Sequence, residues 1–171
     1  MKQLYRFSPI ETKERLFEVI EYLHNNCLEL VEKVYGDKLP VAGNVAVFCH
    51  FDHEYSYLSD LAESLTIKSS NPNQKYFQLK EAITHDGYKY EWLYIRKPHG
   101  DSPEVGDIDF VLSHEAFLDL KSKVKSGAIQ NAKVYNPTNW DMIEISSTEY
   151  DVLPYISTKA MAERARIQHS E

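Results

Sequence analysis

The sequence predicts an α+β fold, in which an N-terminal helical segment precedes two β-α-β-β(-β) modules that face each other across a cavity. The main observation is a short pattern that occurs twice, at Val47–Glu54 and at Ile108–Glu115. In each copy, apolar residues alternate with a period of two, which is typical of a strand. A helix N-cap candidate, Asp52 or Ser113, and a helical pattern then follow. Further strand patterns come after each helix, and a repeated β-α unit of this kind largely determines the fold class.

Length and composition point to a domain with its own core that binds neither nucleic acid nor membranes. The chain has 171 residues, of which 43% are hydrophobic, and its formal net charge is −7. An acidic protein is a poor partner for nucleic acid, because phosphate binding needs a basic surface. We expect no signal sequence, and no apolar run approaches the roughly 20 residues of a membrane helix. Two cysteines are too few for a disulfide framework, so we expect a cytoplasmic protein.

The first predicted element is a long helix or a helical hairpin over residues 8–36. Ser8 can cap the helix, Pro9 suits its first position and Glu11 completes a capping box. Asn25-Asn26 separates two apolar stripes, so the segment could bend or break there. Gly36 is a typical residue for a helix end. The segment is expected to cover the core.

The first module is predicted at residues 44–97. Its helix has leucines at helical spacing, and His85-Asp-Gly87 is a typical hairpin turn between two strand patterns. The predicted elements are a strand at Asn44–Phe51, a helix at His53–Leu65, and strands at Lys75–Ile83 and Tyr88–Lys97.

The second module is predicted at residues 106–147, and a C-terminal helix at residues 157–168. Residues 151–156 are expected to form a loop, and Ser157 or Thr158 to cap the last helix. The elements of the module are a strand at Gly106–Leu112, a helix at Ser113–Lys125, and strands at Ala132–Asn136 and Asp141–Ser147, joined through Asn136–Asn139. We assign all of these segments to a single domain, residues 1–171.

Alternation along the strands predicts which side chains line the cavity. Val45, Val47 and Cys49 would face the helix, so their neighbours face the other way. Buried carboxylates are costly unless they are paired or bound to metal, so a polar set of this kind suits a ligand pocket. The alternative is an open face with solvated side chains. The cavity-facing candidates are Asn44, Ala46, Phe48, His50, Tyr76, Gln78, Lys80, Tyr90, Trp92, Tyr94, Arg96, Asp107, Asp109, Val111, Met142, Glu144 and Ser146.

The two modules resemble the vicinal-oxygen-chelate superfamily, which includes glyoxalase I, extradiol dioxygenases and bleomycin-resistance proteins. The resemblance rests on the sequences NVAVFCH at residues 44–50, YEWLYIRKP at 90–98 and GDIDFVL at 106–112. Within the superfamily the chain is most similar to the YecM-like proteins, a group with N-terminal helices before the modules and an expected metal site. This resemblance covers residues 8–147 and implies that the modules form a half-barrel around the cavity.

The resemblance also implies a divalent metal, which His or Glu ligands from four strands hold in this superfamily. Two of the four positions fall on Asp107 and Glu144, and both side chains can bind a hard cation. The other two fall on Asn44 or Ala46 and near Arg96, none of which is a suitable ligand. His50 could substitute for one of them. The implied metal site therefore contains His50, Asp107 and Glu144.

Three functions remain open at this point. As an enzyme of the superfamily, the protein would be a metal-dependent lyase, isomerase or dioxygenase-like protein, with Asp109 as the catalytic base. As a metal-free module, it would bind a small anionic or aromatic ligand. As a nucleotidyltransferase-like enzyme, it would use Asp107 and Asp109 to hold magnesium. In each case a small molecule is the expected partner and a homodimer is possible. The ligand-binding candidates are Lys80, Trp92, Tyr94 and Arg96.

Overall fold

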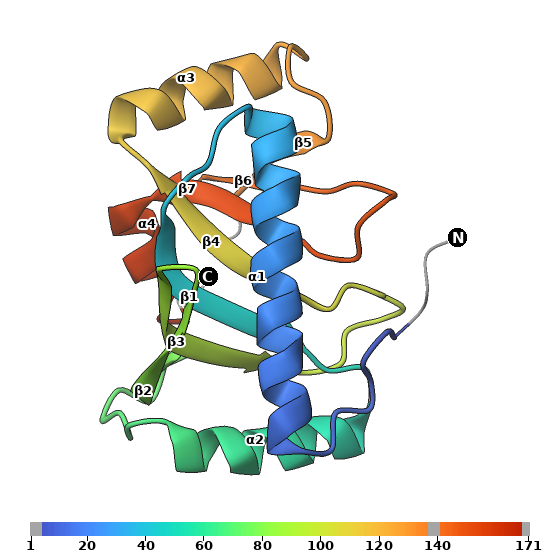
Figure 1. Ribbon diagram of the computed structural model, residues 1–171. Coiled ribbons are helices and arrows are strands. Elements are labelled where there is room, and N and C mark those ends of the chain that lie inside the picture. The colour runs from blue at the N-terminus through green and yellow to red at the C-terminus, as the bar shows by residue number, and fades with distance from the viewer. Residues whose placement is uncertain (1–4, 137–140, 169–171) are drawn as a thin grey trace.

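The computed structural model describes residues 5–136 and 141–168. Within these residues the chain forms four helices and one mixed sheet of seven strands, which confirms the predicted α+β class. The strands lie in the order β2-β3-β1-β4-β7-β6-β5. The long N-terminal helix α1 crosses one face of this sheet, and α2 and α3 lie at opposite ends of it (Figure 1). In the part of the chain that is described, none of the helices is both long and apolar enough to cross a membrane.

The N-terminal segment forms one uninterrupted helix, α1 (Lys13–Tyr35). Thr12 caps it, and Gly36 ends it with a φ of 96°, a left-handed conformation that glycine adopts at little cost. Asn25-Asn26 does not break the helix. The prediction that Ser8 caps it is wrong, because the helix begins five residues later and the Ser8 hydroxyl instead contacts the first module.

The first module contains β1 (Val41–Phe48), α2 (Asp52–Leu65), β2 (Phe77–His85) and β3 (Tyr88–Arg96). The predicted hairpin turn is confirmed, since Asp86 and Gly87 between β2 and β3 have φ angles of 51° and 83°. The predicted cap is wrong. Phe51 occupies the N-cap position of α2 without any side-chain hydrogen bond, and Asp52 is already helical.

The second module contains β4 (Gly106–Leu112), α3 (His114–Lys125), β5 (Ala132–Tyr135), β6 (Met142–Ile145) and β7 (Tyr155–Thr158), and α4 (Lys159–Arg164) follows it. The predicted caps Ser113 and Thr158 are confirmed, because each side chain accepts a hydrogen bond from the first turn of its helix. The predicted loop at residues 151–156 is wrong in its last two residues, which open β7. Residues 137–140 of the predicted link between β5 and β6 lie outside the described residues.

The two modules pair their strands in the same order around a central antiparallel pair, β1 with β4, which we call the module seam. On one side β1 is parallel to β3, and β3 is antiparallel to β2. On the other side β4 is parallel to β7, and β7 is antiparallel to β6. The backbones approach closely at Gly106, where an added Cβ would lie 2.1 Å from the Ala46 carbonyl oxygen and 2.9 Å from Cδ1 of Leu23.

The sheet has one apolar face and one polar face, largely as alternation predicts. The face under α1 holds the main core, to which Val45, Val47, Ile108 and Ile143 belong. The opposite face, which we call the polar face, carries Asn44, Ala46, Phe48, Trp92, Tyr94, Arg96, Asp107, Asp109, Glu144 and Tyr155.

Tyr90 is the exception on β3. Its ring is buried in the core under α1, and its hydroxyl lies 2.7 Å from Nδ1 of the buried His24. The prediction that Tyr90 faces the cavity is therefore wrong. Simple alternation fails at this point because the pairing of β2 with β3 shifts register between Gln78 and Ile83, beside Tyr90.

Candidate ligand-binding face

One row of polar side chains crosses the polar face from β3 to β6. In register, Trp92 lies beside Asn44, and Tyr155 lies beside both Asp109 and Glu144. The Asn44 amide donates a hydrogen bond of 2.8 Å to Asp109 across the module seam. The Tyr155 hydroxyl donates one of 2.9 Å to Glu144. The strands therefore bring together residues from both modules that are far apart in the sequence.

The neighbouring row contains Asp107, the other carboxylate of β4. Asp107 pairs in register with Ala46, and Ala46 with Tyr94, so the three side chains lie side by side on three strands. Arg96 lies one row further along and pairs with Phe48. The Arg96 guanidinium carbon is 3.4 Å from the centre of the Phe48 ring, which is a close cation-π contact.

Two more cations reach this face from outside the strands. The Arg166 guanidinium, beyond α4, lies 4.6 Å from the Trp92 ring centre, and the Lys75 ammonium, before β2, lies 4.9 Å from that of Tyr94. The sequence prediction missed both residues. Alternation along the predicted strand Lys75–Ile83 placed Lys75 on the opposite face, although β2 begins only at Phe77, and Arg166 belongs to no strand.

The C-terminal segment covers the row that contains Asp109. Asn44 donates to the Ala162 carbonyl oxygen at 2.9 Å and accepts from Nε of Arg166 at 2.7 Å. The Arg166 carbonyl oxygen accepts hydrogen bonds from the backbone at Lys75, which ties the segment to the edge of the first module. Asp109 is only 2% exposed as a result, compared with 8% for Asp107.

Burial controls the acidity of the two carboxyl groups of β4. Desolvation raises the pKa of Asp109 to about 6, while the Asn44 hydrogen bond and the charges of Lys75 and Arg166 oppose the rise. Desolvation and the negative charge of Asp109 also raise the pKa of Asp107, against the opposing charges of Lys75 and Arg96. The pair therefore holds protons more strongly than exposed aspartates do.

Two side-chain atoms on the polar face stand out because they lack hydrogen-bond partners. Among the buried side-chain nitrogen and oxygen atoms of residues 5–136 and 141–168, only Nε of Arg96 and Oδ1 of Asp107 have none. A buried polar atom without a partner costs about 1–3 kcal/mol, so such atoms are rare and call for an explanation. A bound ligand that contacts both atoms would remove this cost.

Six of the eight predicted site residues lie on the polar face: Trp92, Tyr94, Arg96, Asp107, Asp109 and Glu144. Lys80 does not lie there. It is exposed, and its ammonium donates a hydrogen bond of 3.1 Å to the Ser64 carbonyl oxygen at the end of α2.

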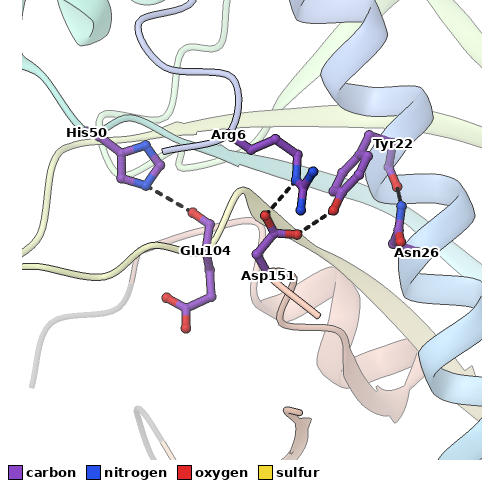
Figure 2. Close-up of polar contacts among 6 residues, drawn as sticks. All are labelled: Arg6, Tyr22, Asn26, His50, Glu104 and Asp151. Atoms are coloured by element: carbon purple, nitrogen blue, oxygen red, sulfur yellow. Dashed lines mark hydrogen bonds and ion pairs between the residues drawn. The ribbon is translucent and has the colours of Figure 1, made fainter. Parts of the chain in front are cut away.

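His50 also lies away from the polar face, because β1 ends at Phe48. Its Nδ1 is 2.7 Å from the Ser8 hydroxyl, and its Nε2 is 3.1 Å from the Glu104 carbonyl oxygen. Figure 2 shows His50 beside Glu104, near the point where Asp151 accepts hydrogen bonds from Arg6 and Tyr22. These contacts attach the N-terminal segment to the modules.

The implied metal site is not assembled by these positions. His50 has both ring nitrogens in hydrogen bonds, and Glu144 is paired with Tyr155 and with Lys133 at 3.3 Å. In the described part of the chain, no group of three or more His, Cys, Asp or Glu side chains is arranged to hold a metal ion. The residues present therefore do not fit the three-ligand site, and cations already balance the carboxylates.

A separate recess of about 310 Å³ lies between α1 and the loops around β5 and β6. Lys33, Asn131 and Tyr150 are among its lining residues. In this recess the Tyr150 hydroxyl accepts from Lys33 at 2.5 Å and donates to the neighbouring Glu29 at 2.7 Å. This recess has none of the unsatisfied atoms found on the polar face.

Comparison with known proteins gives a structural likeness only. The chain matches no family model and no curated protein sequence. A solved structural-genomics protein, EC4020, is similar with a TM-score of 0.53 and 10% identity, over 88% of this chain and 92% of that chain. A Streptomyces coelicolor methylmalonyl-CoA epimerase variant in complex with 2-nitronate-propionyl-CoA aligns with a TM-score of 0.34 and 14% identity, over 70% and 99% of the two chains. The first likeness concerns the fold alone, and the second is too distant to support an argument.

Proposed function

We propose that this protein is a small-molecule-binding protein of the vicinal-oxygen-chelate type, and that its polar face binds a small anionic ligand without a metal ion. The observation that carries the proposal is the pair of unsatisfied buried atoms, Nε of Arg96 and Oδ1 of Asp107. The matching strand order of the two modules around the seam supports the assignment to this superfamily. The helix before the modules favours the YecM-like group.

An anion suits this face better than an aromatic ligand. The guanidinium of Arg96 is a permanent cation with a free donor, and Lys75 adds a second positive charge near Asp107. The rings of Phe48, Trp92 and Tyr94 already have cations against them, so they are not open stacking surfaces. An anion would also offset the positive charge that remains when the carboxyl pair holds a proton.

A second candidate function is proton transfer to or from the bound ligand, as in an isomerase or a lyase. The raised pKa of Asp107 favours this candidate, because a general acid or base works best when its pKa lies near the working pH. Asp109 was the predicted base, but Asn44 and the C-terminal segment enclose it. Asp107 is therefore the better candidate to exchange a proton with a ligand. Buried free thiols at Cys27 and Cys49 also suit a cytoplasmic protein.

A thermal-shift screen with small carboxylates and phosphates tests the proposed function. The protein is first treated with a chelator, and its metal content is measured by elemental analysis. We expect at least one small anion to raise the melting temperature of the metal-free protein, with no effect of added divalent metals. Arg96→Gln should abolish the shift, and Lys80→Gln should keep it, because Lys80 lies away from the polar face.

Two results of this screen would contradict the proposal. One is that no anion shifts the melting temperature of the metal-free protein. The other is that ligand binding needs about one equivalent of bound metal. That result would favour the metal-dependent enzyme instead.

A further inference from the structure

The two unsatisfied atoms of the polar face have complementary chemistry and come from different modules. Nε of Arg96, on β3, can only donate a hydrogen bond, whereas an ionised Asp107, on β4, can only accept one. Solvent does not reach either atom, so neither protein nor bulk water meets their hydrogen-bonding capacity. One molecule that has both an acceptor and a donor would satisfy both atoms at once.

The register of the strands limits the size of such a molecule. Only β1 separates the strands of Arg96 and Asp107, and Arg96 lies one row further along, so their backbones are about 12 Å apart. The long side chain of Arg96 covers part of this span. Tyr76 packs against Ala46 and Phe48, which leaves little free space over this part of the face, so a ligand has to be small.

The surrounding charges favour a monoanion or a zwitterion over a multiply charged anion. The carboxylates Asp107, Asp109 and Glu144 lie among the cations Lys75, Arg96 and Arg166, and Glu144 is also paired with the exposed Lys133. A dianion such as phosphate would place a second negative charge close to three carboxylates. A single carboxylate on Arg96, with a neutral or positive donor on Asp107, avoids that repulsion.

From these contacts we infer that the ligand is a small hydroxy- or amino-carboxylate. Its carboxylate accepts a hydrogen bond from Arg96, and its hydroxyl or ammonium group donates one to Asp107. This inference rests on the proposed function and adds the donor group and the role of Asp107 in recognising it. Specificity then follows from the unpaired acceptor, because a site built to bind a donor strongly rejects an analogue that lacks it.

Matched ligands on one carbon skeleton test the inference in solution. Propanoate, lactate and alanine differ only in having no donor, a hydroxyl group or an ammonium group beside the carboxylate. Each is titrated into the full chain, and binding is followed by amide chemical shifts. We expect lactate or alanine to bind at least about tenfold more tightly than propanoate, which is the effect of one good hydrogen bond.

Two variants assign the effect to particular side chains. Asp107→Ala, which removes the acceptor, should abolish the preference for lactate or alanine over propanoate. Arg96→Gln should weaken all three ligands, and Lys80→Gln should weaken none. The amide spectra of the variants show whether each one is folded, and the comparison of ligands on the unaltered protein does not depend on them.

The possible failures are distinguishable. Propanoate that binds as tightly as lactate and alanine, with Arg96→Gln still disruptive, overturns this inference and leaves the proposed function intact. An unchanged preference in a folded Asp107→Ala variant also overturns the inference. If none of the three ligands binds while another anion from the screen does, the hydroxy- or amino-carboxylate class is wrong. If no anion binds at all, the proposed function fails as well.

Discussion

The first module, β1 to β3, and the second, β4 to β7, share one strand order but present opposite charges on the polar face. The first contributes Arg96 and, just before β2, Lys75, both stacked on aromatic rings. The second contributes the carboxylates Asp107, Asp109 and Glu144, the last of which is paired with the exposed Lys133 of β5. The difference shows that a repeated skeleton preserves the face that packs against α1 and leaves the other face free to diverge. Buried carboxylates in one module are tolerable because the other module supplies cations.

The second difference between the modules concerns the same dipeptide, His-Glu, at the start of α2 and α3. Glu54 in α2 is fully buried, and its carboxylate accepts hydrogen bonds from the backbone of Ile10 at 2.5 Å and of His50 at 2.6 Å, and from Ser8 at 3.0 Å. Glu115 in α3 is exposed. Ser8 and Ile10 of the N-terminal segment contact Glu54, so the same dipeptide has different structural roles in the two modules.

The largest expected effect comes from the module seam. Gly106 stands where the repeated pattern has Val45 in the first module, and a Cβ there would lie 2.1 Å from the Ala46 carbonyl oxygen. We expect Gly106→Ala to lower the free energy of unfolding by about 3 kcal/mol or more, because backbone atoms cannot yield to the methyl group. Urea unfolding followed by circular dichroism measures the loss. An alanine variant as stable as the original chain would contradict the close approach of the strands.

The two His-Glu sites should differ almost as strongly. Glu54→Gln replaces a buried acceptor of three hydrogen bonds with an amide that brings its own donors. We expect it to lower the free energy of unfolding by about 2–3 kcal/mol, and Glu115→Gln to change it by less than about 0.5 kcal/mol. Equal effects at the two sites in the same urea experiment would show that the N-terminal segment does not dock on Glu54.

The buried carboxyl group of Asp107 should make the free energy of unfolding depend on pH. The pKa of Asp107 is raised above the usual value of 3.8, so the folded state binds its proton more tightly than the unfolded state does. The resulting stabilisation is complete below about pH 4 and is lost as the pH rises through the folded-state pKa. We therefore expect Asp107→Asn to gain stability relative to the original chain, by about 1 kcal/mol or more between pH 4 and pH 8.

The slope with pH, rather than the absolute difference, is the relevant readout, because asparagine can alter local hydrogen bonds equally at every pH. Unfolding in urea at several pH values supplies it. A difference between the variant and the original chain that is constant with pH would mean that Asp107 titrates normally and that burial does not disfavour its charge.

The smallest expected effect on stability concerns the partners of Glu144 in the second module. Tyr155→Phe removes the hydroxyl that donates to Glu144, and we expect a loss of about 1 kcal/mol in the free energy of unfolding. Lys133→Ala removes the exposed partner of the same carboxylate and should cost less, about 0.5 kcal/mol or below. Thermal melts of the two variants compare them directly. A larger effect at Lys133 would reverse this ranking.

Much of the fold was predictable because its periodic signals are strong. Alternation with a period of two correctly placed Trp92, Tyr94 and Arg96 of β3 on the polar face, and Ser113 and Thr158 were recognisable as helix caps. β7 was missed because it has only four residues, and one of its two partner strands, β4, is distant in the sequence. Short strands of this kind depend on tertiary pairing more than on local pattern.

The site was less predictable than the fold, for two physical reasons. A shift of register changes which face a strand residue occupies, and the shift between β2 and β3 lies beside Tyr90, which faces the core instead of the polar face. Side chains that reach a site from irregular segments carry no periodic signal, which applies to Lys75 and Arg166. His50 was misplaced because the end of β1, two residues earlier, could not be located from alternation alone.

The most direct test of the central claim is a crystal structure of the protein grown with the tightest-binding acid from the screen. We expect the ligand between the two modules, with its carboxylate on Nε of Arg96 and its hydroxyl or ammonium group on Oδ1 of Asp107, the atoms that have no other partner. A ligand seated instead in the recess beside Lys33 and Tyr150, or coordinated to a metal ion, would contradict the claim that the oppositely charged faces of the two modules form one binding site.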